Sequence, residues 1–207
     1  RAVRVRPIDS TELPALVGVV RACDPDDRVG PAEFEDWRRQ ADDTVWLLAE
    51  EDGCVVGSAV GVHGWHSPPG RLLVEIRTAP DARRRGAGTA LLAALTSWAA
   101  ELGATEIVGE VGDDDPKSLA WATRRGFVEV GRSKRVALDL DAVESPPVAP
   151  PAGIEIASWS DRPGIEAGLY AVYCEAEPDI PGEEHNEIAS LDRWLADDMQ
   201  GVADRAD

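Results

Sequence analysis

The sequence contains little cysteine and no spacing typical of metal ligands. Its three cysteines, Cys23, Cys54 and Cys174, are odd in number and stand far apart. The two nearest histidines, His63 and His66, stand beside a pair of prolines in a stretch that reads as a loop. We therefore expect reduced thiols and no metal.

Long apolar runs are also missing. No segment reaches the length that crosses a membrane, and the first residues lack the layout of a signal peptide. These absences predict a cytoplasmic protein without a membrane partner.

Basic residues are in the minority, with 21 Lys and Arg against 39 Asp and Glu and a formal net charge of −18. A nucleic-acid backbone would meet net repulsion, which excludes that partner. The acidic excess suits a cationic substrate, although it also serves solubility. Residues 143–207 hold 15 acidic and 3 basic residues, net −12, which leaves 24 and 18, net −6, for residues 1–142.

A local basic spot stands within the first part, at Arg83-Arg84-Arg85-Gly86-Ala87-Gly88-Thr89. It lies between a strand-like run at 72–78 and a helical run at 90–102. Such a loop presents free N–H groups and the positive end of a helix dipole to an anion. Glycines allow close approach of the backbone, and arginines add forked donors. The segment predicts a phosphate or pyrophosphate site.

The spacing around this loop narrows the ligand. With its strand the segment reads Ile76-x-Thr78-x-Pro80-x-x-Arg83-x-x-Gly86-x-Gly88-x-x-Leu91-Leu92. A Walker loop is excluded because no Gly-Lys-Ser/Thr follows, and a single Gly-x-Gly among arginines does not fit a dinucleotide fingerprint. The pattern resembles the acetyl-CoA signature of the GCN5-related N-acetyltransferases (GNATs). An arginine-rich turn before an ordinary helix is the alternative.

The expected order of elements agrees with that resemblance over about residues 2–141. The pattern predicts strands at 2–6, 44–49, 54–62, 72–78, 105–111, 127–131 and 135–140, and helices capped by Ser10 or Thr11, starting at Pro31, and at 88–102 and 116–125. Asp52-Gly53 predicts a hairpin turn and Gly103 a left-handed helix end. The resemblance implies an α/β (α+β) GNAT fold, a mixed, mostly antiparallel twisted sheet flanked by helices.

The resemblance also implies how acetyl-CoA, the cosubstrate, would bind. In the family, the strand before the loop and the strand after the long helix separate, and the pantetheine arm fills the gap. Backbone groups of Ile76 and Thr78 would bond the pantetheine and polarise the thioester carbonyl, and residues 84–89 would hold the pyrophosphate. The predicted cofactor-binding residues are Ile76, Arg77, Thr78, Arg83, Arg84, Arg85, Gly86, Ala87, Gly88, Thr89, Asp115 and Ser118.

Two glutamates qualify as the general base that an attacking amine needs, because amines are mostly protonated at neutral pH. Glu75 lies in the strand before the loop and Glu110 in the strand after the long helix, places where some GNATs carry catalytic glutamates. Either is alternatively a solvated or ion-paired strand residue. Arg77, on the same face as Glu75, is a ready partner, so Glu110 is slightly favoured.

A further family motif departs from its usual form. The stretch from Asp115 to Phe127 has Ala122 where the family commonly has a tyrosine that protonates the leaving CoA thiolate. Alanine cannot do so, and the indole of Trp121 is a donor that does not release its proton. Water would then protonate the thiolate.

The rest of the chain repeats its beginning in outline. After a proline-rich linker at 143–153, a shift of 151 places Ile154-Glu155-Ile156 on Val3-Arg4-Val5 and Cys174-Glu175 on Cys23-Asp24. We expect a GNAT domain at 1–142 and the start of a second GNAT repeat, truncated, at 154–207, or else a chance likeness between two strand–helix pairs. The absent initiating methionine favours a fragment of a tandem protein. The apolar helix faces of the second part would need the first domain, a homodimer or a missing C-terminal segment to cover them.

The sequence thus predicts an acyl-CoA-dependent N-acetyltransferase that acetylates a small amine by direct attack in a ternary complex. The alternative, favoured by Ala122, is a GNAT module that binds CoA without catalysis, as a sensor or as a structural half of a tandem protein.

Overall fold

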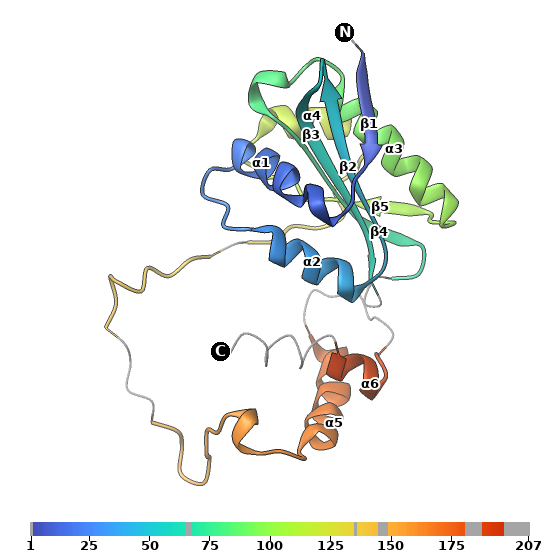
Figure 1. Cartoon of the computed structure of the whole chain (residues 1–207). Helices are drawn as coiled ribbons and strands as arrows, with labels where there is room; N and C mark the ends of the chain where they lie inside the picture. The colour runs from blue at the N-terminus through green and yellow to red at the C-terminus, as the bar shows by residue number, and fades with distance from the viewer. Residues whose placement is uncertain (1, 65–67, 135, 145–148, 181–187, 197–207) are drawn as a thin grey trace. The chain divides into compact units, whose positions relative to one another are not determined.

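A computed structural model of the whole chain describes residues 2–64, 68–134, 136–144, 149–180 and 188–196. Its described strands form one sheet in the order β1-β2-β3-β4-β5 (Figure 1). The first three pairings are antiparallel and the last, β4 with β5, is parallel. The expected mixed, mostly antiparallel sheet is confirmed, with strands β1 Val3–Pro7, β2 Ala41–Glu51, β3 Cys54–Gly64, β4 Arg71–Thr78 and β5 Glu106–Val108.

The hairpin between β2 and β3 forms at the predicted turn. Asp52 and Gly53 have φ angles of +53° and +79°, so both central residues take the left-handed conformation that a tight hairpin requires. The strands then pair antiparallel over their length, with Leu48 opposite Ser58.

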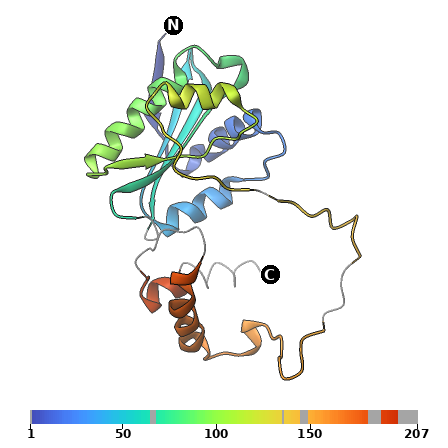
Figure 2. The ribbon, with the colours of Figure 1, turned by 180° about the vertical axis from the view of Figure 1, so that it is seen from behind.

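Helices cover both faces of the sheet (Figures 1 and 2). On one face, α1 (Leu13–Cys23) and α2 (Pro31–Gln40) bury a core with Trp46, Leu48 and Val60 of the sheet. On the other face, α3 (Ala87–Glu101) buries Leu91 and Leu95 against alternate residues of the same strands. The alternation of side chains along a strand therefore divides β2 and β3 between two cores.

The structure confirms the predicted end of one helix and corrects the predicted start of another. At the end of α3, Gly103 has φ +73°, as its position predicted. At the start of the first helix, neither Ser10 nor Thr11 is the N-cap. Asp9 accepts the Thr11 N–H at 2.9 Å and starts a 3₁₀ turn, η1 (Ser10–Glu12), so α1 begins only at Leu13. The carboxylate of Asp9 thus caps the first turn, one residue before the earlier of the two expected positions.

Two predicted strands of the first domain are not formed. Residues 127–134 and 136–140 contain no strand, and Val128, Val130, Val136, Leu138 and Leu140 are 67–89% exposed. The strand expected at 105–111 is also shorter, since β5 ends at Val108. Alternating apolar residues suit a sheet, but a strand exists only beside another strand, and β5 offers a partner only three residues long.

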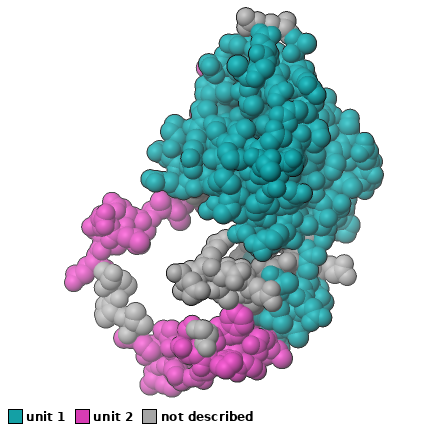
Figure 3. All heavy atoms as spheres, in the orientation of Figure 1, with its two compact units in different colours: residues 1–110, 170–207 teal, residues 111–169 magenta. Residues whose placement is uncertain are grey.

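Two compact units divide the chain, residues 1–110 with 170–207 and residues 111–169 (Figure 3). The second unit contains α4 (Pro116–Thr123) and η3 (Trp159–Asp161). Residues 154–158 form no strand, so the expected strand at 154–156 is wrong. β1 is a strand because β2 pairs with it, whereas no strand among the described residues pairs with 154–156. The helix expected after that strand is present as α5 (Glu166–Ala176).

The C-terminal part of the first unit is held against the sheet domain. After η4 (Glu177–Asp179), the short α6 (Leu191–Trp194) buries Trp194. Arg193 donates to a carboxylate oxygen of Asp42 and to the carbonyl of Gln40, each at 2.9 Å. This segment does lean on the first domain, although Val172 of α5 remains exposed. None of the helices in the described ranges is long and apolar enough to cross a membrane.

We predict opposite effects for two Gly→Ala substitutions. A Cβ on Gly61 in β3 would lie 2.5 Å from the Trp98 ring, so Gly61→Ala should destabilise the protein by about 1–3 kcal/mol. In the matched control, Gly18 in α1 has open space around its Cβ position, and Gly18→Ala should stabilise by about 0.5–1 kcal/mol. Urea unfolding measures both, and a stable Gly61→Ala variant would contradict the packing of α3 on β3.

Candidate active site

The N-terminus of α3 is built to accept an anion. Gly86 is the N-cap with φ +102°, no side chain caps this end, and the first turn contains no acidic residue. The N–H groups of Thr89 and Ala90 both bond to the Gly86 carbonyl. Those of Ala87 and Gly88 are left at the positive end of a 15-residue helix.

Two other helices of this chain, α2 and α4, have a carboxylate that accepts from the backbone at their N-terminus, whereas α1, like α3, has no side-chain cap. Glu33 accepts the Gly30 N–H at the start of α2, and Asp115 accepts the Ser118 N–H at the start of α4. The contrast supports the prediction that the start of α3 is reserved for a ligand.

The three arginines before α3 differ in what they contact. Arg83 donates from Nε to the carbonyl of Thr78 at 3.2 Å, and Arg85 pairs with Glu51 at 3.0 Å. Arg84 is exposed, and the structure records no ion pair or hydrogen bond for its side chain within the described residues. Its φ of +68° is unusual for a residue with a Cβ. The cation with the greatest freedom to meet a ligand is therefore Arg84.

Among the described residues, no strand pairs with the outer edge of the second half of β4, where only the Thr78 carbonyl has a partner, the Nε of Arg83 and the Sγ of Cys23. Ala79 donates to the Val56 carbonyl of β3 at 3.0 Å, and in an antiparallel pair the residues that bond the neighbouring strand alternate. Arg77 therefore bonds β3, whereas the N–H and C=O groups of Ile76 and Thr78 point to the opposite edge. These are the two residues for which backbone contacts to pantetheine were predicted.

The edge is open because β5 leaves it early. Parallel pairing ends at Leu73 with Val108, and Gly109, the residue that follows β5, passes close to β4. A Cβ on Gly109 would lie 2.8 Å from the Val74 carbonyl oxygen. Sequence reasoning did not single out Gly109, although a glycine directly after a short strand is a signal of close backbone approach.

Glu75 is engaged in the ion pair that its spacing allowed. Arg77 donates from Nε to a Glu75 oxygen at 2.6 Å, and its other nitrogen lies 3.5 Å from Asp27 in the α1–α2 loop. The pKa of Arg77 is raised, since its carboxylate neighbours outweigh the desolvation of the half-buried guanidinium. With its side chain in this network and its backbone bonded to β3, Arg77 is poorly placed for the predicted contact with the cofactor.

Glu110 is exposed and lies two residues beyond β5, not within a strand as expected. The shorter β5 places it after Gly109, on the backbone that moves away from β4. Its carboxylate stands in no ion pair or hydrogen bond that the structure records for the described residues.

Cys23, at the end of α1, lies against the end of β4 and was not predicted to be near the site. Its Sγ is 3.4 Å from the Thr78 carbonyl oxygen. Burial raises the pKa of the Cys23 thiol above its usual value, despite the nearby Arg83 and Arg77. The group therefore stays protonated at neutral pH, which makes it a weak donor and not a nucleophile.

Asp115 and Ser118, two of the predicted cofactor-binding residues, lie at the start of α4, which belongs to the second unit. Oδ2 of Asp115 also accepts the Ser118 hydroxyl at 2.6 Å, so these two side chains satisfy each other. The Trp121 ring carries the Arg125 guanidinium 4.1 Å from its centroid, and Ala122 is half-buried. Their predicted contacts with the cofactor stay predictions.

In the described part of the chain, no three His, Cys, Asp or Glu side chains lie close enough together to hold a metal ion. His63 lies at the end of β3, not in a loop, with Nδ1 3.6 Å from Asp43. His66 lies outside the described residues.

Comparison with known proteins decides the family. The model of the acetyltransferase (GNAT) family matches residues 8–127, more than half of the chain. The chain belongs to the GNAT family. The predicted family is therefore confirmed. The family match stops at residue 127, so it gives no evidence of a second GNAT copy.

A curated GNAT relative and several solved structures are similar. The L-2,4-diaminobutyric acid acetyltransferase of Nocardia farcinica is 34% identical over 84 residues, which are 39% of this chain and 44% of the relative. The chain thus matches less than half of that relative's length. Aminoglycoside acetyltransferase AAC(6')-Iy, solved with a bisubstrate analogue, is 22% identical with TM-score 0.56, over 67% of this chain and 99% of its own. Ribosomal-protein-alanine N-acetyltransferase of Brucella melitensis is 26% identical with TM-score 0.53, over 62% and 86%.

We predict that Gly86→Asp abolishes cosubstrate binding. Acetyl-CoA should raise the Tm of the native protein, because a ligand that binds only the folded state stabilises it. An aspartate at the N-cap of α3 would put a negative charge where the phosphates bind. Gly86→Asn is the matched control, since it has the same shape and the same left-handed backbone without the charge. An undiminished Tm shift in Gly86→Asp would refute the phosphate site.

Arg84→Gly should stabilise the free protein and weaken its binding of CoA. Glycine relieves about 1 kcal/mol of backbone strain at φ +68°, but it removes the unpaired guanidinium. We expect a Kd about tenfold higher, the loss of one charge-assisted hydrogen bond. Arg84→Lys, which keeps both charge and strain, should change either quantity little. Calorimetric titration and urea unfolding measure the two effects, and unchanged affinity in Arg84→Gly would contradict the role.

Proposed function

We propose that this GNAT protein transfers the acetyl group of acetyl-CoA to a primary amino group of a small cationic amine, by direct attack in a ternary complex. The observation that supports it most is the continuity of the unpaired edge of β4 with the uncapped start of α3. A long ligand with amides at one end and a pyrophosphate at the other fits that sequence of donors.

The backbone of β4 supplies the polar groups for the acetyl end. Ile76 points its N–H and C=O groups, and Thr78 its N–H group, to the open edge, where they would orient the pantetheine and where the N–H groups would stabilise the oxyanion that forms on the thioester carbonyl. The Thr78 carbonyl already accepts from Arg83. One well-aimed donor contributes about 3 kcal/mol to such a transition state. The N–H groups of Ala87 and Gly88, with Arg84, would hold the pyrophosphate at the other end.

The acceptor is proposed from charge and from the relatives. The net charge of −18 favours the approach of cations. Two of the similar proteins are named for aminoglycosides and for 2,4-diaminobutyric acid, compounds with more than one amino group. Release of CoA by these two compounds, by simple polyamines and by peptide N-termini is the assay that tests the proposal.

The proposed reaction needs one base from the protein, and water supplies the acid. A base takes the proton of the ammonium, and the neutral nitrogen then attacks the carbonyl carbon. The C–S bond breaks as the C–N bond forms. The nitrogen then releases its second proton to water, and the thiolate takes a proton from water, because Ala122 offers none, so that water carries the proton from nitrogen to sulfur. Of the two glutamates, we favour Glu110 as the base, since Glu75 is held by Arg77.

We predict that Glu110→Gln lowers kcat on the order of a hundredfold or more while the affinity for acetyl-CoA is retained. The carboxylate acts on the amine and contacts no phosphate. Glu75→Gln is the matched variant. A large loss in Glu75→Gln alone would reverse the two roles, and full activity of both would show that bulk water removes the proton.

A GNAT module that binds CoA without catalysis is the second candidate, because Ala122 replaces the usual acid. Tight CoA binding by a protein that releases no CoA with any of these amines would favour it.

The division of the chain belongs to the same proposal. We propose a GNAT domain at 1–142, a linker at 143–153 and a partial second GNAT-like domain at 154–207, supported by the repeat in sequence and by the presence of α5. A cytoplasmic location follows from the supply of acetyl-CoA and agrees with three free cysteines.

A further inference from the structure

Glu51 is a buried carboxylate that has no part in the proposed acetyl transfer. It is the last residue of β2, and it is 6% exposed. Its Oε2 lies 3.0 Å from Nη1 of Arg85. A charge removed from water to this extent is stable only when it is paired, so the contact with Arg85 is a requirement of the buried position.

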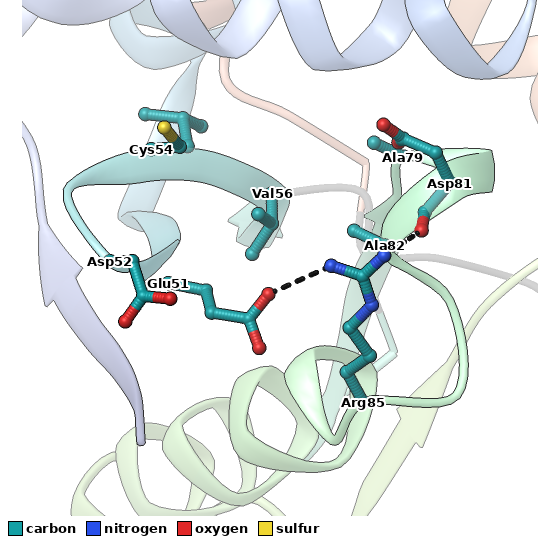
Figure 4. A pocket seen from close by; sticks show the side chains of 9 residues that line it. Glu51, Asp52, Cys54, Val56, Ala79, Asp81, Ala82 and Arg85 are labelled. Atoms are coloured by element: carbon teal, nitrogen blue, oxygen red, sulfur yellow. Dashed lines mark hydrogen bonds and ion pairs between the residues drawn. The ribbon is translucent and has the colours of Figure 1, made fainter. Parts of the chain in front are cut away.

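Arg85 connects Glu51 with the loop before α3. Its Nη2 donates to the carbonyl of Asp81 at 2.5 Å, within the 3₁₀ turn η2 (Pro80–Ala82) that follows β4. Figure 4 shows the guanidinium between the Glu51 carboxylate and this carbonyl, beside a cavity of about 280 Å³. One planar side chain thus joins the end of β2, the turn after β4 and the residue next to the N-cap Gly86.

This bridge fixes the backbone that would bind the phosphates. Arg85 stands directly before Gly86, whose left-handed conformation directs the chain into α3. Its guanidinium is held from two sides, although the side chain is 46% exposed, and these contacts favour the observed conformation of the peptide between Arg85 and Gly86. The free N–H groups of Ala87 and Gly88 follow at once. Orientation of donors before the ligand arrives lowers the entropy lost on binding.

We infer that Glu51 is a positioning residue for the cosubstrate: through Arg85 it holds the phosphate-binding loop in its binding conformation, without contacting the ligand. The inference rests on the proposed function. It assigns the arginines separate tasks, since Arg85 is committed to Glu51 and Asp81 while Arg84 remains for the phosphates.

The test compares Glu51→Gln with Glu50→Gln. Glutamine keeps the size of the side chain and removes the charge. Glu50 is the preceding residue of the same strand, and its carboxylate pairs with Arg6 at 2.9 Å, away from the loop. Calorimetric titration with CoA should show a Kd about tenfold higher for Glu51→Gln and little change for Glu50→Gln. Arg85→Gln should reproduce the loss, and the double variant Glu51→Gln/Arg85→Gln should lose no more than either single variant.

A second ligand separates positioning from general damage to the fold. S-acetylpantetheine carries the same acetyl end without phosphates, and its NMR shift titration should give the same Kd for wild type and Glu51→Gln. Equal weakening towards both ligands would show a merely structural role and overturn the inference. Tighter CoA binding by Glu51→Gln would also overturn it, because Glu51 would then withhold Arg85 from the phosphates. Failure of the wild type to bind CoA would instead refute the proposed function, and this inference with it.

Discussion

The site depends on a single interruption of hydrogen bonding in the sheet. β4 is paired on both edges only as far as Leu73, because β5 ends at Val108. Beyond that point one edge of β4 must find another partner, since unpaired backbone groups are costly to bury. The same interruption allows Gly109 to pass against Val74 and leaves the N–H and C=O groups of Ile76 and the N–H group of Thr78 for the pantetheine in the proposed complex. A longer β5 would give a more regular sheet without this edge.

The second constraint is electrostatic. The chain carries a formal charge of −18, yet the proposed phosphate site lies at the start of α3. Screening reduces the effect of distant charges, so three arginines next to the helix end dominate the local field. These three adjacent arginines also repel one another. The pairing of Arg85 with the buried Glu51 neutralises one of them, which leaves the loop cationic without three unpaired guanidinium groups in sequence.

Local patterns predicted the parts of the structure that local physics decides. The Asp52-Gly53 hairpin, the left-handed Gly103 and the glycine-rich start of α3 each follow from backbone preferences of a few residues. The strands at 127–131 and 135–140 were wrong for the opposite reason: their alternation is local, but pairing depends on a distant strand. Glu51 was missed as well, because its partner lies 34 residues away and a glutamate at the end of a strand looks solvated.

The left-handed backbone of Arg84 is best understood through the pairing of its neighbour Arg85 with Glu51. In a loop that must turn sharply twice, at residues 84 and 86, glycine is the residue of lowest strain at both places. Glycine stands only at the second. Because Glu51 and the Asp81 carbonyl already occupy Arg85, and Arg83 donates to Thr78, a glycine at position 84 would leave the loop without an arginine free of such contacts. In the proposed site, the strain at Arg84 is therefore accounted for by the contacts of its two neighbours, and the positioning role that we infer for Glu51 includes leaving Arg84 for the phosphates.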